Sequence, residues 1–257
     1  MYTIKIDHMN LNQIADSGQC FRWKQVNNNT YKIPAFGKEI TISQNNDLFT
    51  VSCDETEWNN IWYNYFDLDT NYNEIESIVM KSNDEFLKAA YQFGSGIRIL
   101  RQDLWETIIS FIISQNNNIP RIKKSIEKLC DENNGVFPDY HKLMNMDLSD
   151  KGLGYRDKYL KSACLCGWWT DLYYTIQSMS YNEVKTEIMK IKGIGNKVAD
   201  CICLFGLHYL DAFPIDTHIN KIIDMKYNGN IPEWANSKYA GVLQQYIFYY
   251  DLKFNKI

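Results

Sequence analysis

A single lysine stands at the start of a segment that has the pattern of a buried helix. In "IMKIKGIGNKVADCICLFG", residues 188–206, the positions after Lys197 make one apolar helix face: Val198, Cys201, Ile202 and Phe205. The dipole of a helix disfavours a cation at its N-terminal end, which favours the neutral amine that attacks a carbon centre. Lys197 is therefore a candidate nucleophile, although the same position also suits an ordinary surface lysine.

A candidate carboxylate follows nineteen residues later. "AFPIDTHINKII" places Asp216 directly before another helical pattern, where an aspartate commonly serves as the N-cap. Because capping also fixes the carboxylate in space, Asp216 is at the same time a candidate catalytic group. One amine and one carboxylate at two helix starts would suit displacement at a sugar carbon that develops positive charge.

The segment before Lys197 predicts a tight turn between two helices. Ser180 and Glu183 have the spacing of a capping box at the start of the first helix. Gly193 can adopt the left-handed conformation that ends a helix, Gly195 allows another chain to approach the backbone closely, and Asn196 is expected to cap the second helix. Amides at such a helix start bind phosphate without net positive charge. A G-x-G turn between helices is more often only a turn, so the spacing alone leaves both interpretations open.

The order of the sequence patterns predicts an α+β fold. The first ~75 residues alternate apolar and polar positions between Asn-, Asp- and Gly-rich turns, which indicates an antiparallel sheet. Its expected strands are YTIKID, CFRWKQ, TYKIPAF, KEITIS and DLFTVSC. Later segments have a helical period, and the expected helices cover residues 56–66, 103–115, 119–130, 180–191, 196–207, 216–227 and 238–252. We therefore expect an antiparallel β-sheet domain over residues 1–80 and a mostly α-helical domain over residues 81–257 that carries the helix-hairpin-helix motif.

Composition excludes several classes of protein. A hydrophobic content of 45% and an aromatic content of 14% in 257 residues fit a globular chain and argue against disorder. Apolar runs stay below the ~18 residues of a membrane span, and the N-terminus lacks the pattern of a signal peptide. We therefore expect an intracellular protein of the cytoplasm, nucleoid or nucleus, without membrane association. Seven cysteines without a C-x-x-C pair are expected to be reduced thiols and not disulfides or zinc ligands.

The formal net charge of −4 is unevenly distributed. Residues 1–85 contain 6 Lys and Arg against 13 Asp and Glu, whereas residues 86–257 contain 21 against 18. Extended neutralisation of phosphates needs more basic surface than this, but a compact site of backbone amides and a few side chains does not. The acidic balance therefore does not exclude a nucleic-acid partner.

Together these motifs resemble a known family. "IKGIGNKVADCICLFGL" followed by "AFPIDTHI" is similar to the helix-hairpin-helix and Gly/Pro-Asp signature of the DNA glycosylase superfamily. More narrowly, the chain resembles the 8-oxoguanine DNA glycosylase/AP lyases in the hairpin and in residues 17–23, 96–122, 152–160 and 240–252. The resemblance implies excision of a flipped 8-oxoguanine, preferentially opposite cytosine, through a lysine Schiff base, followed by nicking of the abasic site. It also implies a monomer that binds double-stranded DNA and needs no cofactor or metal, with room for a structural monovalent cation at the hairpin.

The resemblance assigns the chemistry to residues of this chain. Lys197 matches the nucleophile that attacks C1′ of the damaged nucleotide, and Asp216 matches the carboxylate that stabilises the developing sugar cation and supports the lysine. Gly18 matches the residue whose carbonyl accepts the N7–H that 8-oxoguanine has and guanine lacks. Three further matches contact the flipped base: Gln244 at its Watson–Crick edge, and Cys201 and Phe248 on its two faces. From spacing alone, Gly18 would be a turn residue and the two sandwiching residues would belong to the core.

A second set of matches surrounds the flipped nucleotide. Asn116, Arg121 and Arg156 match residues that contact the estranged cytosine. Tyr155 matches the wedge that fills the gap left by extrusion, although "GYRDKY" taken alone would be a solvated helix start. Pro120 departs from the family pattern and bears on how this segment meets DNA.

The remaining matches concern phosphate. Gly193 and Gly195 match the hairpin that binds the DNA backbone. His218 matches a position near the 5′ phosphate, and a histidine on a helix surface is an equally compatible interpretation.

Two other functions compete with the bifunctional enzyme. A monofunctional alkylbase glycosylase would use Asp216 without a hairpin lysine, and a non-catalytic helix-hairpin-helix module that binds DNA would need the glycines alone. The iron–sulfur branch of the superfamily would need four clustered cysteines after Asp216, and no cysteine follows Cys203. Lys197, Asp216 and a base-reading set in one chain favour the bifunctional enzyme.

Overall fold

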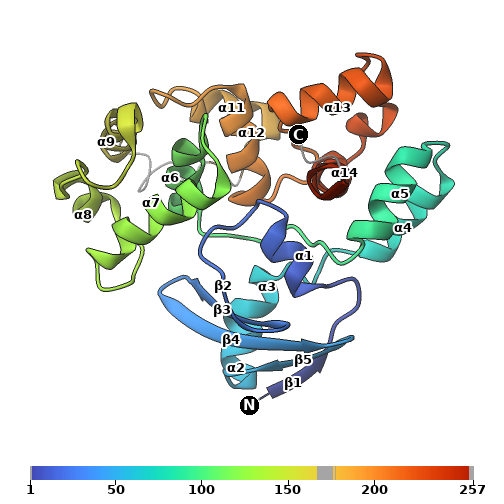
Figure 1. Cartoon of the computed structure of the whole chain (residues 1–257), viewed down its shortest axis with the longest axis horizontal. Coiled ribbons are helices and arrows are strands. Elements are labelled where there is room, and N and C mark those ends of the chain that lie inside the picture. The colour runs from blue at the N-terminus through green and yellow to red at the C-terminus, as the bar shows by residue number, and fades with distance from the viewer. Residues whose placement is uncertain (1, 167–175, 177, 255–257) are drawn as a thin grey trace. The chain divides into compact units, whose positions relative to one another are not determined.

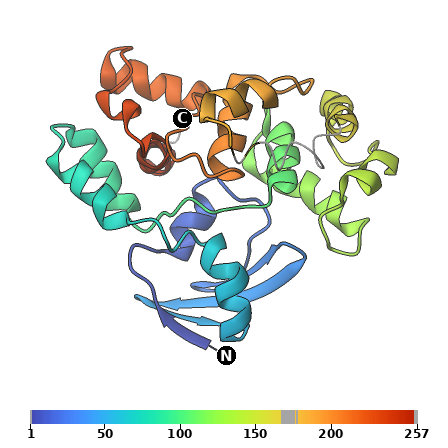
Figure 2. The same ribbon diagram turned by 180° about the vertical axis from the view of Figure 1, so that it is seen from behind.

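The computed structural model describes residues 2–166, 176 and 178–254, which Figures 1 and 2 show from opposite sides. The chain forms two compact units. We call Met1–Arg101 with Leu210–Ile257 the sheet unit, and Gln102–Tyr209 the hairpin unit. These units group residues by contact, so the predicted domain boundary at residue 80 stays a prediction.

The sheet unit contains five antiparallel strands in the order β1-β5-β4-β3-β2. They are β1 Tyr2–Lys5, β2 Lys24–Asn27, β3 Thr30–Ala35, β4 Lys38–Asn45 and β5 Leu48–Val51. The predicted antiparallel sheet is confirmed, and Asn29 and Asn46 turn two of its hairpins with φ of 55°. The predicted strand CFRWKQ is wrong for residues 20–23, because β2 begins at Lys24. Trp23 is instead buried, and its indole N–H donates to the Tyr65 hydroxyl over 2.8 Å.

One face of the sheet carries the core of this region. Alternate residues of β3, β4 and β5 are buried there: Tyr31, Ile33, Ala35, Ile40, Ile42, Phe49 and Val51. Helical turns cross this face, as Figure 2 shows, in the order α2 Glu55–Glu57, the π-helical turn η1 Trp58–Trp62 and α3 Tyr63–Tyr65. They bring Trp58 and Trp62 into the same cluster. A short helix that the sequence analysis did not predict, α1 Leu11–Asp16, adds Leu11 and Ile14.

The sheet unit contains further helical elements. They are α4 Tyr72–Lys81, α5 Glu85–Gly94, α13 Thr217–Tyr227, the 3-10 turn η3 Glu233–Asn236 and α14 Ala240–Phe254. The helices α5 and α14 pack through aromatic rings, with Phe93 stacked on Tyr249 and Tyr91 edge-on to Tyr246, each pair at 5.3 Å. The helix α14, which carries two predicted base-contact residues, is therefore held along its buried side.

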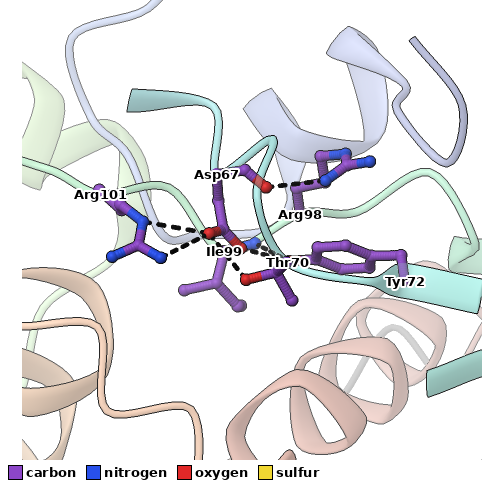
Figure 3. A network of polar contacts seen from close by, with 6 residues as sticks. All are labelled: Asp67, Thr70, Tyr72, Arg98, Ile99 and Arg101. Carbon is purple, nitrogen blue, oxygen red and sulfur yellow. Dashed lines mark hydrogen bonds and ion pairs between the residues drawn. The ribbon is translucent and has the colours of Figure 1, made fainter. Parts of the chain in front are cut away.

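A polar network around Asp67 holds residues 98–101, with which the first part of the sheet unit ends (Figure 3). Asp67 is fully buried, and its Oδ1 accepts from the Thr70 hydroxyl at 2.8 Å and from Arg101 Nε at 3.1 Å. Arg98 Nη1 donates to the Asp67 carbonyl at 2.8 Å, and its guanidinium lies 4.4 Å from the centre of the Tyr72 ring. Burial lowers the pKa of Arg98 from its usual value. Because the Asp67 carboxylate pairs with Arg101 and the Arg98 guanidinium donates to backbone carbonyls, residues 98–101 are anchored within the unit.

The regular secondary structure in the described residues of the hairpin unit is helical. Its elements are α6 Leu104–Ser114, α7 Ile119–Asp131, α8 Tyr140–Asn145, the 3-10 turn η2 Gly154–Arg156, α9 Asp157–Leu165, α11 Tyr181–Ile188 and α12 Asn196–Phe205. The predicted helices are confirmed here and in the sheet unit, apart from their end residues. The helices α6 and α12 pack through Phe111 and Phe205, whose rings stack at 5.4 Å.

Two further observations concern the state of the cysteines and the length and polarity of the helices. All seven cysteines are thiols and form no disulfide. Within the part of the chain that the structure describes, every helix is too short or too polar to cross a membrane.

Candidate active site

Lys197 lies in the first turn of α12, as predicted, with its side chain half-buried. Its ammonium nitrogen is 5.5 Å from the centre of the Phe111 ring on α6, a cation–π distance. Phe111 is itself held by its stack on Phe205. The Lys197 amine therefore lies over the Phe111 ring, at the end of α12 where the helix dipole disfavours a cation.

The cap of α12 differs from the prediction. Gly195, with φ −97° and ψ −178°, is the N-cap residue, so the prediction that Asn196 caps this helix is wrong. Asn196 is the first helical residue, and the N-cap residue makes no side-chain hydrogen bond to the helix start. A glycine cap leaves the first amides of α12 without a side-chain acceptor, which suits an anion supplied from outside.

A buried aspartate joins the two helices of the hairpin. Asp200 on α12 accepts from the Tyr181 hydroxyl at 2.5 Å and pairs with the Lys185 ammonium at 2.8 Å, and both partners lie on α11. The predicted capping box of Ser180 and Glu183 begins α11. The contacts of Asp200 link α11 to α12 and so stabilise the hairpin between them.

The two hairpin glycines have different surroundings. Gly193 has φ +94°, and an added Cβ would lie 2.3 Å from Cγ of Tyr159 on α9. Gly195 has open space around its Cβ position within 4 Å. Gly193 is therefore needed for the fold of the turn, whereas Gly195 leaves room for an approaching group.

Arg156 is a structural residue in this structure. It is buried, with 6% of its surface exposed, so a solvated helix start is wrong for this position. Its Nη2 donates to the Asn116 carbonyl at 2.8 Å and also to the Gln115 carbonyl, and its Nη1 donates to the Leu153 carbonyl at 3.0 Å. Asn116 has φ +46°, so Arg156 holds a left-handed turn between α6 and α7. Its predicted contact with cytosine stays a prediction.

Tyr155 and Arg121 are exposed beside this turn. Half of the Tyr155 surface is accessible, and its ring lies under the Arg156 guanidinium at 4.7 Å and edge-on to Tyr159 at 5.8 Å. Arg121 lies in the first turn of α7, where Pro120 also lies and costs no hydrogen bond. The hairpin unit thus brings the predicted wedge close to the turn of Asn116 and joins it through Tyr159 to the hairpin.

In the sheet unit, Asp216 caps α13 as predicted. Its Oδ1 accepts from the Ile219 amide at 2.8 Å. His218, two residues later, lies 2.9 Å from the carboxylate of buried Asp251 and edge-on to the Phe248 ring at 5.1 Å. His218 is therefore part of a side-chain cluster with α14 and not a free surface histidine.

Three of the residues predicted to contact the base lie in the sheet unit, on α14 or directly after α1. Gln244 is 5% exposed, and among the described residues its Oε1 has no hydrogen-bond partner. Phe248 lies one helical turn further along α14. Gly18 follows α1 with φ +80°, a conformation that favours glycine. Cys201 belongs to the hairpin unit, where it is buried on α12.

Several residues that hold these groups were not predicted from the sequence. Asp251 pairs with His218, Gln245 donates to the Ser17 carbonyl at 2.5 Å, and Tyr159 packs on Gly193. The signal for two of them was present, because Gln245 and Asp251 are polar residues in the largely apolar and aromatic sequence of α14. A buried polar side chain generally has a specific partner.

Comparison with known proteins agrees with this arrangement. Residues 1–108 match the family model described as 8-oxoguanine DNA glycosylase, N-terminal domain. The Saccharomyces cerevisiae N-glycosylase/DNA lyase is 29% identical, over 84% of this chain and 68% of its own length. The Clostridium acetobutylicum 8-oxoguanine glycosylase/lyase in its apo form is 35% identical, with a TM-score of 0.86 and coverage of 96% of this chain and 94% of its own. The same enzyme bound to double-stranded DNA with cytosine opposite 8-oxoguanine is 33% identical, with a TM-score of 0.87 and coverage of 100% and 99%. The chain therefore belongs to the 8-oxoguanine DNA glycosylase/lyase family of the helix-hairpin-helix superfamily.

Proposed function

We propose that this protein excises 8-oxoguanine from double-stranded DNA and then cleaves the resulting abasic site. The observation that carries the proposal is Lys197 at a glycine-capped helix start, in a chain that belongs to this family. A module that only binds DNA has no use for an amine placed over an aromatic ring at that position.

The chemistry assigned to Lys197 is displacement at C1′. Its neutral amine forms a bond to C1′ while the N-glycosidic bond breaks, and the base leaves with the electron pair of that bond and takes up a proton. The sugar ring then opens to an iminium between Lys197 and C1′. Loss of a proton from C2′ expels the 3′ phosphate, which is the lyase step. Asp216, fixed by its hydrogen bond to the Ile219 amide, is proposed to stabilise the positive charge of the sugar.

Recognition of the damaged base is assigned to the sheet unit and to Cys201. The Gly18 carbonyl would accept the N7–H of 8-oxoguanine, and Gln244 would pair with its Watson–Crick edge. Phe248 and Cys201 would cover the two faces of the base. The unsatisfied Oε1 of buried Gln244 supports this assignment, because such an oxygen favours a ligand that donates to it.

Recognition of the opposite strand is assigned to the hairpin unit. Tyr155 would fill the gap left by the flipped nucleotide, and the turn of Asn116 with Arg121 would contact cytosine. Arg156 already donates to the backbone of that turn, so we propose that it acts first by holding Asn116 in place. The open amides at Gly195 would bind a phosphate, and His218 would lie near the 5′ phosphate.

The proposal extends to the oligomeric state, the compartment and the cofactor requirement. The protein is proposed to act as a monomer on DNA, in the cytoplasm, nucleoid or nucleus, and without a catalytic cofactor. No group of three acidic, histidine or cysteine side chains among the described residues could hold a metal ion. A monovalent cation at the hairpin would therefore be held by backbone carbonyls, and comparing DNA affinity in potassium and in tetramethylammonium buffers tests it.

Borohydride trapping tests the proposed reaction. The wild-type protein should form a covalent adduct with duplex that contains 8-oxoguanine opposite cytosine. Lys197→Gln should abolish excision and trapping while binding to the same duplex persists. Lys192→Gln is the control, because Lys192 is an exposed lysine of the same hairpin. Excision without trapping by the wild type would indicate a monofunctional glycosylase, and binding without excision a DNA-binding module.

A further inference from the structure

The loop that carries Gly18 is fastened to α14 by one buried side chain. Gln245 is 3% exposed, and its Nε2 donates to the Ser17 carbonyl over 2.5 Å. Ser17 is fully buried, and its hydroxyl donates to the Ile14 carbonyl at 2.8 Å. A residue 228 positions away in the sequence thus holds the peptide directly before Gly18.

The peptide after Gly18 is held by a second amide. Gln19 is fully buried, and its Nε2 donates to the Ser17 hydroxyl at 3.0 Å and to the Arg98 carbonyl at 2.9 Å. Its Oε1 accepts from the Leu100 amide at 2.9 Å. Gln19 therefore anchors one side of the loop to the segment that Asp67 fixes, and Gln245 anchors the other side to α14.

Two successive glutamines of α14 have different environments. Gln244 has an unsatisfied Oε1 among the described residues, whereas Gln245 uses its amide on the loop. A buried side-chain amide without a partner is destabilising. We therefore ask what Gln244 would bind and what the hydrogen bond of Gln245 does. For Gln244 the proposed partner is the flipped base. For Gln245 the structure gives the answer directly, since its partner is the backbone next to Gly18.

We infer that Gln245 is a positioning residue for damage recognition, which sets the Gly18 carbonyl relative to Gln244 on the same helix. This inference rests on the proposed function, because it assumes that Gly18 accepts the N7–H of 8-oxoguanine. A single carbonyl distinguishes the damaged base from guanine, and a hydrogen bond weakens steeply with distance and angle. A loop released from α14 would therefore lose recognition of the base before it lost any chemistry at the sugar.

The test compares two activities of the same protein. Single-turnover excision of 8-oxoguanine opposite cytosine requires the base contact, whereas cleavage of a preformed abasic site opposite cytosine does not. Gln245→Met removes the donor and keeps the length of the side chain, and Gln245→Asn keeps the amide but is too short to reach Ser17. We expect both variants to excise 8-oxoguanine about 5- to 20-fold more slowly, as expected for one buried hydrogen bond, with abasic cleavage within about twofold of wild type.

Lys253→Met is the matched control. The Lys253 ammonium pairs with Asp16 over 2.7 Å, so it also joins α14 to α1 without contacting the Gly18 loop, and both activities should stay within about twofold. The inference is overturned if Gln245→Met and Gln245→Asn excise like wild type, or if excision and abasic cleavage fall by the same factor. If Gln245→Met does not fold, Gln245→Asn decides. A failure of the proposed function is distinguishable, because the wild-type protein itself would then not excise 8-oxoguanine.

Discussion

Alanine at Gly193 should destabilise the protein much more than alanine at Gly195. At Gly193 an added Cβ would lie 2.3 Å from Cγ of Tyr159 and 2.6 Å from both Cδ atoms, and the backbone has φ +94°. At Gly195 the backbone has φ −97°, and the space within 4 Å of the Cβ position is open. The same chemical change thus meets two different environments in one turn.

The expected magnitude follows from two contributions. A non-glycine residue at positive φ costs about 1–3 kcal/mol, and displacing a packed ring costs about 1–3 kcal/mol more. Gly193→Ala should therefore lower the free energy of unfolding by about 2–6 kcal/mol, or the melting temperature by roughly 4–12 °C at about 2 °C per kcal/mol for a chain of this size. Gly195→Ala changes only an N-cap residue and should cost below about 1 kcal/mol.

Calorimetry on both variants measures this difference, and a double variant isolates the ring. In Tyr159→Ala with Gly193→Ala the clash is gone, so the loss should be smaller than the sum of the two single losses. Additive losses, or a Gly193→Ala melting temperature within about 2 °C of wild type, would refute the steric reasoning.

The two variants should also differ in DNA binding. If a phosphate approaches the open amides at Gly195, the methyl group of Gly195→Ala occupies its path. Affinity for duplex with an abasic-site analogue should then fall about tenfold, while stability falls by less than about 1 kcal/mol. Fluorescence anisotropy at fixed salt measures this affinity. Unchanged affinity in a stably folded Gly195→Ala protein would remove the phosphate role from this glycine.

Other predictions concern single side chains. Asp216→Asn should slow excision by orders of magnitude yet cost only about 1 kcal/mol of stability, which melting and single-turnover rates on one preparation separate. Wild-type excision opposite cytosine should exceed that opposite adenine by at least about tenfold, and Arg121→Ala, at an exposed position, should flatten this preference with stability changed by less than about 0.5 kcal/mol; equal wild-type rates on all four pairings would contradict the assignment. Asp67→Asn should cost about 2–3 kcal/mol in denaturant unfolding, because a buried carboxylate that accepts from Arg101 and Thr70 is replaced by an amide; a loss below about 0.5 kcal/mol would show that the charge is not needed.

The sequence predicted the elements because their patterns are local. Alternation marked the sheet, and the capping box at Ser180 and the cap at Asp216 are formed as their spacing indicates. The error at residues 20–23 has a tertiary cause, since Trp23 turns inward to Tyr65 where a strand would alternate. The error at Asn196 arose because asparagine and glycine both suit an N-cap, and the choice depends on the turn before it.

The roles of the candidate residues could be predicted only from the resemblance to a family. Their positions in space depend on contacts with side chains that are distant in the sequence. Three loops with left-handed backbone carry these assignments, at Gly18, Asn116 and Gly193. Each loop is held by a side chain from a helix elsewhere in the same unit: Gln245 on the Ser17 carbonyl, Arg156 on the Asn116 carbonyl and Tyr159 against Gly193. No sequence periodicity links these pairs.

This arrangement also explains how a chain with net charge −4 can bind DNA through a few groups. A loop that is rigid before binding loses little conformational entropy when a base or phosphate arrives, so fewer contacts suffice than for a flexible basic surface. Gln245 and Tyr159 are neutral, and Arg156 is a single buried cation bonded to backbone carbonyls, so this rigidity does not depend on an extended basic surface. Basic residues are then needed only at the points of contact, such as the one proposed for Arg121, and not as an extended patch.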